Sequence, residues 1–577
     1  MRQIATDILI LGSGGAGLFA ALHAKRGAPG LKVTIAVKGL LGKCGCTRMV
    51  QGGYNVALAP GDSVERHFMD TIEGGKWLPD QELAWTLVTK AIERVHELEN
   101  EIGCFFDRNP DGSVHQKAFA GQTFDRTVHK GDLTGIEIIN RLAEHVWSAG
   151  IERLEEHRAI DIVPSREGDR VAGVVMIDMR EGELVLVRAR AVLLATGGGP
   201  TMYRYHTPSG DKSCDGLAMA LRAGLTLRDM EMVQFHPTGL LAGPGTRMTG
   251  TVLEEGLRGA GGYLLNGSRE RFMQRYDPRG ERATRDIVSR AMFSEMRAGR
   301  ATPQGGLYIV MKHLGPEKVR AQFKGMVDRC RDCGFDLAAG EVEVVPTAHY
   351  MMGGVEFAAD ATTALEGLFA AGEDTGGVHG ANRLGGNGVA NSTVFGAIAG
   401  DTMAQWTRSA GALREPDPRV VEAARDRVQF PLGKPVGGIE TIREELYALM
   451  WDDVGIQRNA EGLARARAKL AGLRAALAAT GTGASDLRYN LTWHDWLNLD
   501  SLITVSGAIL EAADARRESR GAHFREDFPA SDDPARSAFS RVRSIGSHEV
   551  AAPDRFDVAF QPVAFTRVRP GQSLIAA

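Results

Sequence analysis

The sequence predicts an α/β fold of several domains, because of its length and the pattern at its beginning. With 577 residues, the chain is longer than one hydrophobic core supports. Asp7–Leu11 reads as an apolar strand, and it is followed by a glycine turn, a helix to about Lys25 and a second strand at Lys32–Val37. A strand, a helix and a strand in this order form the βαβ unit that opens a parallel sheet.

The glycine turn predicts a dinucleotide-binding site of the Rossmann type. The turn follows a strand and opens a helix, and its G-x-G-x-x-G pattern consists of Gly12, Ser13, Gly14, Gly15, Ala16 and Gly17. In this pattern the first glycine permits a tight turn, the second lets a pyrophosphate approach the backbone, and the third lets helix and strand pack closely. Free N–H groups and the helix dipole favour phosphate at such a helix N-terminus.

Among dinucleotides, FAD fits the sequence better than NAD. The second strand ends at Lys38, with no Asp or Glu that could bind the ribose hydroxyls of NAD. Gln51-Gly52-Gly53 could bring backbone against an isoalloxazine ring, and Ala195-Thr196-Gly197-Gly198 closes a later strand. A further strand ends in Gly372-Glu373. Each segment alone is typical of a loop, but together and in this order they indicate FAD.

Two further elements are predicted from their patterns. Residues 171–195 read as a hairpin of Val171–Arg180 and Glu183–Ala195, joined by Glu181-Gly182. Asn459–Ala479 reads as a helix, because leucines recur at helical spacing with arginines between them.

Changes of pattern along the chain divide it into five segments. Short mixed elements in the second segment indicate an inserted α+β domain, the fourth is mostly helical, and the last reads as a polar tail. The expected segments are the first part of the FAD-binding domain, 1–240; the inserted domain, 241–345; the second part of the FAD-binding domain, 346–400; a helical domain, 401–530; and a C-terminal extension, 531–577.

Charge and composition exclude several classes of protein. The net charge of −4 gives no reason to expect nucleic acid as a partner. The beginning lacks the features of a secretory signal, and no apolar run approaches the length of a membrane span, so we expect a cytoplasmic location. The cysteines lack the spacing of a metal site, and we expect free thiols at Cys44, Cys46, Cys104, Cys214, Cys330 and Cys333.

A set of charged and imidazole side chains indicates an anionic substrate. Its members are His236, Glu255, Arg258, Arg285, His349 and Arg383. Guanidinium groups and imidazoles suit a dicarboxylate, and an arginine paired with a carboxylate could relay a proton. The alternative interpretation of each residue by itself is an ordinary ion pair or a core histidine.

The motifs resemble those of the flavoprotein subunit of succinate dehydrogenase and fumarate reductase, a superfamily that includes L-aspartate oxidase. The resemblance runs from about residue 5 to about residue 530. The motifs are GSGGAG (12–17), QGG (51–53), ATGG (195–198), DMEMVQFHPTG (229–239), EGLRGAGGYLLN (255–266), TRDIVSRA (284–291), PTAHYMMGG (346–354), AAGE (370–373), HGANRLGGN (379–387) and ESRGAHFREDFP (518–529).

The resemblance implies a role for individual residues. It implies that Arg285 exchanges a proton with the substrate and that Glu255 and Arg258 form the relay behind it. The residues that it assigns to the substrate are His236, Glu254, His349, Arg383 and Phe119. To FAD it assigns Lys38, Cys46, Thr47, Asp215, Glu373, Gly388 and Val389 beside the glycine motifs. The inserted domain is expected to cap the flavin, exclude water and bring Arg285 to the substrate.

Three departures from the family pattern bear on these roles. A histidine that bonds covalently to FAD in many respiratory members is replaced by Cys46, so we expect noncovalent FAD, with a thioether as the alternative. A substrate-binding threonine is replaced by Glu254, which would repel a second substrate carboxylate unless it is protonated, paired or turned away. An Asn-Ser-Leu that contacts FAD reads Asn387-Gly388-Val389.

The function expected from these observations is hydride transfer between FAD and a carboxylate such as fumarate or succinate. One alternative is an amino-acid oxidase similar to L-aspartate oxidase, and another is an electron-transfer subunit without a substrate of its own. We expect a separate iron–sulfur subunit or other electron carrier as partner. Such a partner could hold the chain at the inner membrane.

Overall fold

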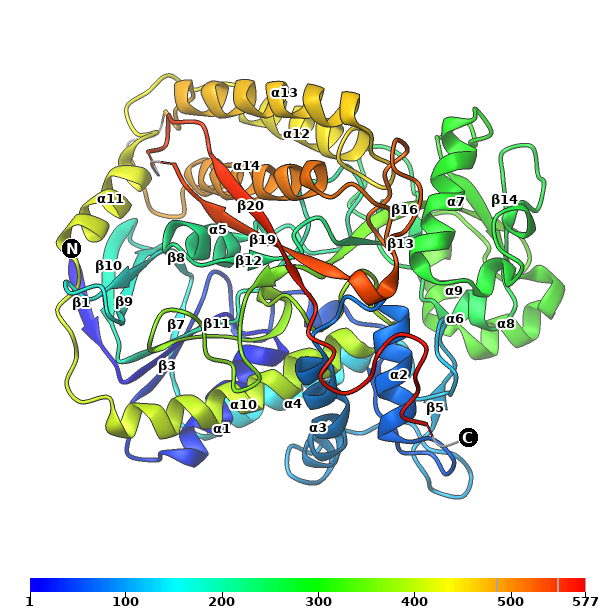
Figure 1. The fold of residues 1–577 in the computed structure, drawn as a ribbon, viewed down its shortest axis with the longest axis horizontal. Coiled ribbons are helices and arrows are strands. Elements are labelled where there is room, and N and C mark those ends of the chain that lie inside the picture. The colour runs from blue at the N-terminus through cyan, green and yellow to red at the C-terminus, as the bar shows by residue number, and fades with distance from the viewer. Residues whose placement is uncertain (484–485, 547–548, 576–577) are drawn as a thin grey trace.

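The computed structural model describes residues 1–483, 486–546 and 549–575, and it confirms the α/β fold (Figure 1). Its central sheet is parallel throughout, with the strand order β18 (Leu368–Ala370), β11 (Ala191–Leu194), β2 (Ile8–Leu11), β3 (Val33–Val37) and β7 (Glu152–Glu155). All four side chains of β2 are buried, because both faces of the sheet are covered.

The helices that follow the glycine motifs cover one face of this sheet. α1 (Gly15–Gly27) packs against α10 (Asn387–Ser409), and their apolar residues share a cluster with Ile8 and Ile10. Leu9 and Leu11 point to the opposite face and join a second cluster. Residues 1–240 also contain the helices α2 (Val64–Gly74), α3 (Gln81–Asn100), α4 (Thr134–Ser148) and α5 (Asp215–Arg222).

The predicted hairpin exists, but its second strand is shorter than expected. β9 (Val171–Asp178) pairs antiparallel with β10 (Glu183–Arg188), in a sheet with β8 (His157–Pro164) and β1 (Arg2–Ala5). The prediction of one strand over Glu183–Ala195 is wrong, because the chain leaves this sheet after Arg188 and enters the central sheet as β11. The Arg190 guanidinium forms an ion pair with Asp7 at this crossing, which holds the chain between the two sheets.

Residues 241–345, here called the inserted segment, lie to one side of the molecule (Figure 1). They contain most of a separate hydrophobic cluster and the strands β15 (Leu307–Val310) and β14 (Tyr263–Leu265) of a sheet. The order of this sheet is β13 (Val233–Leu240), β16 (Glu341–Met351), β15 and β14. The long strands β13 and β16 connect this sheet to the rest of the chain. The helices are α6 (Gly256–Gly259), α7 (Arg285–Arg297), α8 (Pro316–Gln322) and α9 (Lys324–Asp332).

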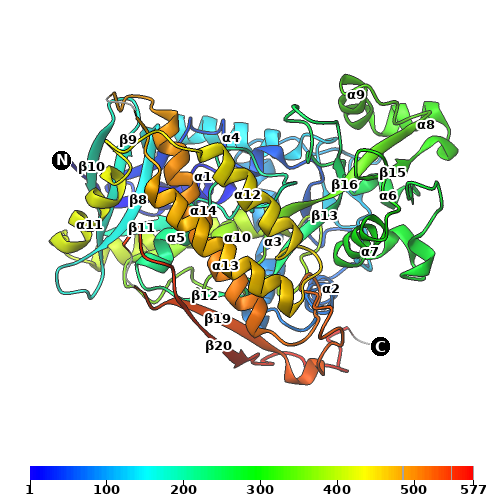
Figure 2. The same ribbon diagram turned by 90° about the horizontal axis from the view of Figure 1, so that it is seen from above.

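Residues 401–530 are mostly helical, as expected. The predicted helix is α13 (Ala460–Ala479), and the side chain of Asn459 caps it by accepting from Gly462 N–H at 2.9 Å. α13 lies beside α12 (Ile439–Asp452) and α14 (Leu491–Ala515) in Figure 2. α11 (Pro418–Gln429) precedes them.

The expectation of a polar tail at the C-terminus is wrong. β19 (Ala538–Ser544) and β20 (Phe556–Pro562) form an antiparallel pair, and β19 also pairs with β12 (Leu227–Arg228), which in turn pairs with β17 (Gly354–Val355). β20 is an edge strand, and its side chains are mostly exposed.

Residues 54–128 contribute one further sheet. A small sheet consists of β4 (Tyr54–Asn55), β6 (Thr127–Val128) and β5 (Gln116–Lys117). Among the described helices, none has the length and apolar character that crossing a membrane requires.

Candidate active site

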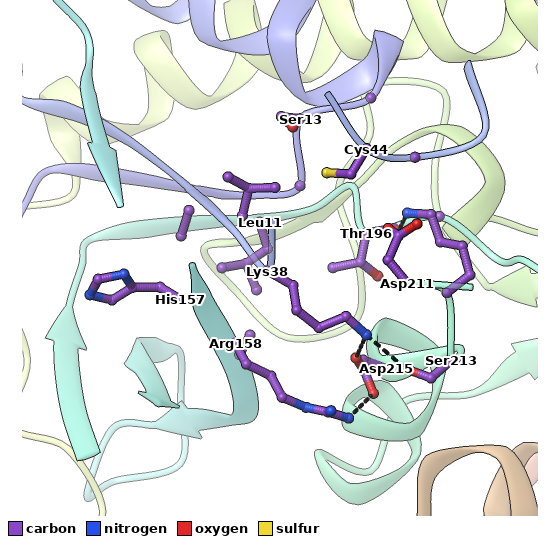
Figure 3. A pocket seen from close by; sticks show the side chains of 18 of the residues that line it. Leu11, Ser13, Lys38, Cys44, His157, Arg158, Thr196, Asp211, Ser213 and Asp215 are labelled. Carbon is purple, nitrogen blue, oxygen red and sulfur yellow. Dashed lines mark hydrogen bonds and ion pairs between the residues drawn. The ribbon is translucent and has the colours of Figure 1, made fainter. Parts of the chain in front are cut away.

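Two adjacent cavities lie at the carboxyl ends of the parallel strands. The large cavity has a volume of about 450 Å³ and the small cavity about 60 Å³. The small cavity begins beside Leu11 and Val37, at the ends of β2 and β3, where open α/β sheets bind their ligands (Figure 3). The cavities share five lining residues, here called the neck: Gly14, Gly45, Thr196, Gly197 and Lys212.

The glycine turn packs closely against its neighbours. Gly12 has a φ of +107°, and a Cβ there would lie 2.2 Å from the carbonyl oxygen of Ala195. A Cβ at Gly17 would lie 2.0 Å from the carbonyl oxygen of Gly12, so a side chain at Gly17 would separate helix from turn. Gly14 precedes α1 without a side-chain cap, which leaves the helix N-terminus open toward the neck.

The small cavity has a carboxylate from α5, Asp215, although β3 itself ends without an Asp or Glu. Asp215 accepts from Lys38 Nζ at 3.0 Å and from Arg158 at 2.8 Å (Figure 3). It also accepts from Ser501 Oγ at 2.8 Å. Burial alone would raise the pKa of Asp215, but Arg158 and Lys38 outweigh it and hold this pKa well below its usual value. The small cavity therefore has an ionised carboxylate that can accept hydrogen bonds from hydroxyl groups.

Arg285 stands at the wall of the large cavity as the first residue of α7. Its Nε and one terminal nitrogen donate to the same oxygen of Glu255, at 3.0 and 2.6 Å, and its other terminal nitrogen donates to Gln234 at 3.0 Å. Arg258 donates to the other oxygen of Glu255 at 3.2 Å and to the carbonyl of Glu281 at 2.7 Å. Burial raises the pKa of Glu255, but the charges of Arg285 and Arg258 lower it by more. Glu255 therefore stays ionised between the two arginines.

Two imidazoles line the same cavity from neighbouring strands. His236 lies on β13 and His349 on β16, with ring centroids 5.4 Å apart. Burial, together with the charge of Arg285, lowers the pKa of both well below the usual value, so both are neutral. His349 Nδ1 lies 2.8 Å from Thr207 Oγ1, and His236 Nδ1 accepts from Thr238 N–H at 3.3 Å. The remaining Nε2 of His236 is thereby free to donate.

Arg383 offers a cation to the large cavity. Its guanidinium stacks over the Tyr350 ring at 4.3 Å from the centroid, and it makes no hydrogen bond to any residue that the structure describes. Burial and the neighbouring charge of Arg285 lower the pKa of Arg383 to about 10. The group therefore remains charged at neutral pH and can bind a carboxylate as a planar fork.

Glu254 is paired rather than free. Its carboxylate lies 3.4 Å from Lys117 Nζ, and its side chain is only 3% exposed. Burial raises the pKa of Glu254, while Lys117 opposes this shift. The Phe119 ring packs against the backbone of Gly52 and Gly385, where added Cβ atoms would approach it to 2.5 and 2.6 Å.

The remaining residues assigned to FAD by resemblance surround the large cavity. Burial raises the pKa of Cys46 to about 12, so this side chain is a thiol rather than a thiolate. Glu373 accepts from the N–H groups of Gly199 and Met351 at 3.2 and 3.0 Å, and burial raises its pKa to about 7. Those that also line the large cavity are Gly15, Ala16, Thr47, Gln51, Gly52, Gly53, Ala195, Gly388 and Val389, beside the neck residues Gly14, Thr196 and Gly197.

The structure brings almost all expected site residues to one of the two cavities. Gly17 and Arg258 line neither cavity and lie behind residues that do. Gln234 was missed, although strand alternation places it on the same face of β13 as His236. Other residues that were missed are Lys117, Arg158, Thr207, Lys212, Tyr350 and Ser501.

Comparisons with known proteins agree with this architecture. A model of the FAD binding domain matches residues 7–389, and a model of the fumarate reductase flavoprotein C-terminus matches residues 443–574. The chain belongs to the succinate dehydrogenase and fumarate reductase flavoprotein family. It is an FAD-dependent oxidoreductase of this type, and the second match includes the strands β19 and β20.

Individual relatives cover nearly the whole flavoprotein. A fumarate reductase (CoM/CoB) subunit of Methanothermobacter marburgensis is 40% identical over 535 residues, which cover 91% of this chain and 94% of that protein. The fumarate reductase flavoprotein subunit of Escherichia coli is 35% identical over 547 residues, which cover 91% and 89%. A solved structure of an E. coli quinol fumarate reductase mutant has a TM-score of 0.92 at 33% identity, covering 99% of both chains.

The two cavities of this flavoprotein fit FAD. An open helix N-terminus lies at the neck, an ionised carboxylate in the small cavity, and glycine backbone at the wall of the large one. The Gln51 side chain lines the large cavity, and its buried Oε1 has no hydrogen-bond partner among the described residues. When bound, FAD supplies the hydride chemistry, while the protein supplies orientation and charge.

Proposed function

We propose that this flavoprotein transfers a hydride between FAD and a small dicarboxylate of the fumarate and succinate type, with Arg285 as the proton-exchanging group. The observation that supports this most is the arrangement of Arg285. It is fixed by Glu255 and Gln234 in the large cavity that two neutral imidazoles and the Arg383 guanidinium also line.

In this proposal the cationic donor neutralises the substrate, and the neutral donors orient it. Arg383 neutralises one carboxylate, because its guanidinium has no other hydrogen-bond partner in the described chain. His236 and His349 donate hydrogen bonds as neutral groups, so they orient the substrate without adding further charge. Reduction of the alkene adds the hydride to one carbon and a proton to the other, and Arg285 is the proton donor.

The relay behind Arg285 returns the proton. Glu255 is ionised and bonded to both arginines, so it can accept a proton from Arg258 and pass it to Arg285. Burial also lowers the pKa of Arg258, which makes it a better acid than an exposed arginine. The reverse path serves oxidation of the saturated acid.

A dye-linked assay of a panel of small carboxylic acids tests this function. Arg285→Ala is expected to lower turnover by roughly a thousandfold, as for loss of a general acid, while FAD stays bound. Arg282→Ala removes an exposed arginine three residues earlier and serves as the matched control, with turnover unchanged. Retained turnover in Arg285→Ala would remove this residue from the role.

The same panel separates the alternative functions. Hydrogen peroxide formed from L-aspartate would favour an amino-acid oxidase. A flavin that none of the acids reduces or reoxidises would favour an electron-transfer subunit.

We further propose that the chain works as a subunit beside an iron–sulfur subunit or other electron carrier. The support is that the relatives from M. marburgensis and E. coli are named as subunits. Such a partner would also determine whether the flavoprotein lies at a membrane. Isolation of the tagged chain from its native cells, followed by iron analysis of the bound fraction, tests this proposal.

A further inference from the structure

The neck between the two cavities carries one charged side chain. Of its five residues, Gly14, Gly45 and Gly197 contribute backbone, Thr196 contributes a hydroxyl, and Lys212 contributes an ammonium group. A ligand that extends from the small cavity into the large one must therefore pass this ammonium group.

Two observations place the ammonium group across the neck. Lys212 Nζ donates to the carbonyl of Thr196 at 2.8 Å. Cβ atoms built on Gly45 and Gly197 would lie 3.7 and 3.6 Å from Nζ, so the group lies beside both glycines. Gly14, the residue before α1, lines the same passage, so the ammonium group and an open helix N-terminus act together on whatever occupies it.

The charge of Lys212 is not neutralised by the described residues. No carboxylate oxygen among them lies within ion-pair distance of Nζ, whereas the nearby Lys38 is paired with Asp215 at 3.0 Å. The group nevertheless stays protonated. Burial lowers its pKa, but nearby acidic groups, Asp211 and Asp374 among them, outweigh burial and raise it above the usual value. The ammonium group is therefore charged and available for a charge-assisted hydrogen bond with an anion in the neck.

We propose that Lys212 binds the pyrophosphate of FAD. Asp215, an ionised carboxylate that can accept from the ribose hydroxyls, lies in the small cavity, and the proposed chemistry takes place in the large one. The part of FAD that joins the adenosine to the flavin ring is its diphosphate, which carries the negative charge that the neck lacks. If FAD is held without a covalent bond, as we expect from the Cys46 thiol, its retention depends on contacts of this kind.

Reconstitution of the apoprotein with FAD tests this inference without any substrate. Lys212→Met is expected to raise the Kd for FAD roughly ten- to a hundredfold, the range for a hydrogen bond to a charged group. Lys212→Arg should keep most of the affinity. Lys43→Met is the matched control, because it removes an exposed lysine two residues before Gly45, and it should leave the Kd unchanged.

Two further measurements separate the possible outcomes. Riboflavin lacks the diphosphate, so its Kd should be the same for Lys212→Met and the wild-type protein; an equal loss for both ligands would overturn the inference. If Lys212→Met does not fold, the Kd values of the wild-type protein for FAD and for riboflavin are measured at low and high salt. The Kd for FAD should rise with salt more than the Kd for riboflavin, and a salt-independent Kd for FAD would contradict the proposal.

Discussion

The Cys46 side chain lies in the large cavity where many family members carry the histidine that bonds to FAD. Its thiol is buried with a pKa of about 12, so the thiolate that could attack a flavin is almost absent at neutral pH. Acid precipitation of the yellow protein is therefore expected to release all FAD into the supernatant. Absorbance of the two fractions checks this, and colour that stays with the precipitate would show a covalent bond.

Glu254 connects substrate choice with pH. Burial raises its pKa, so the group is neutral below that pKa and ionised above it. Because an ionised Glu254 repels a second substrate carboxylate, binding of a dicarboxylate should weaken as the pH rises through this value. Glu254→Thr should remove this dependence and strengthen dicarboxylate binding at pH 8 by about tenfold, the equivalent of one pKa unit.

Flavin difference spectra at several pH values give the Kd for each ligand. Lys117→Met is the companion variant: the ammonium group 3.4 Å away lowers the pKa of Glu254, so its loss should move the weakening of dicarboxylate binding to higher pH. A monocarboxylate is the control ligand and should respond little to either change. Equal pH profiles for the wild-type protein and Glu254→Thr would contradict the assignment.

Residue roles could be predicted where a local motif carries them. Arg285, His349 and Gln234 all stand in long motifs, but the contact of Gln234 with Arg285 and the place of Lys212 at the neck depend on segments that are distant in the sequence. For Gln234 a signal was present, since it lies two residues before His236 on the same strand face. For Lys212 no local pattern existed, because only the folded chain brings Thr196 and Gly45 to it.

At the scale of elements, segments with a regular apolar spacing were predictable, but the points where the chain passes from one sheet to another were not. α13 has regular leucine spacing and begins one residue after its cap, Asn459. The boundary between β10 and β11 was missed because both are apolar, and only their pairing with different sheets separates them. β19 was missed because arginines alternate with its buried residues, a pattern that is also typical of a polar surface segment.

β19 is expected to contribute more to stability than the edge strand β20. Phe539 on β19 is 6% exposed, and the Arg228 guanidinium stacks over its ring at 3.7 Å. Phe539→Ala is therefore expected to lower the free energy of unfolding by about 3 kcal/mol. Phe560→Ala on β20 is the control: its ring is 40% exposed, and its loss should cost less than about 1 kcal/mol.

Denaturant titration of the FAD-loaded variants, followed by flavin and tryptophan fluorescence, compares the two losses. Equal losses for the two phenylalanines would mean that β19 is a peripheral ribbon rather than part of the core.

At the scale of the whole molecule, the large cavity is formed by two parts of the chain. Glu255 and Arg285 come from the inserted segment, whereas His349 and Arg383 come from outside residues 241–345. The α/β class and this insertion were predictable from the order of the patterns, but the contact between the two parts was not, because no local sequence feature records it. The proposed reaction requires both parts, so we propose that the inserted segment acts as a cap over the substrate.

Limited trypsin digestion tests this capping role. Arg247 is exposed in the inserted segment, and the next residue, Met248, already lines the large cavity. A dicarboxylate that holds the cap closed should protect the bond after Arg247, because cleavage follows the fraction of molecules in the open state. With ligand at ten times its Kd, the unliganded fraction falls about elevenfold, and the cleavage rate should fall by about tenfold. Cleavage after Arg536, which is exposed in the C-terminal extension, should continue at its original rate. Equal protection at both sites would indicate general stabilisation, and protection at neither would mean that the inserted segment does not respond to the substrate.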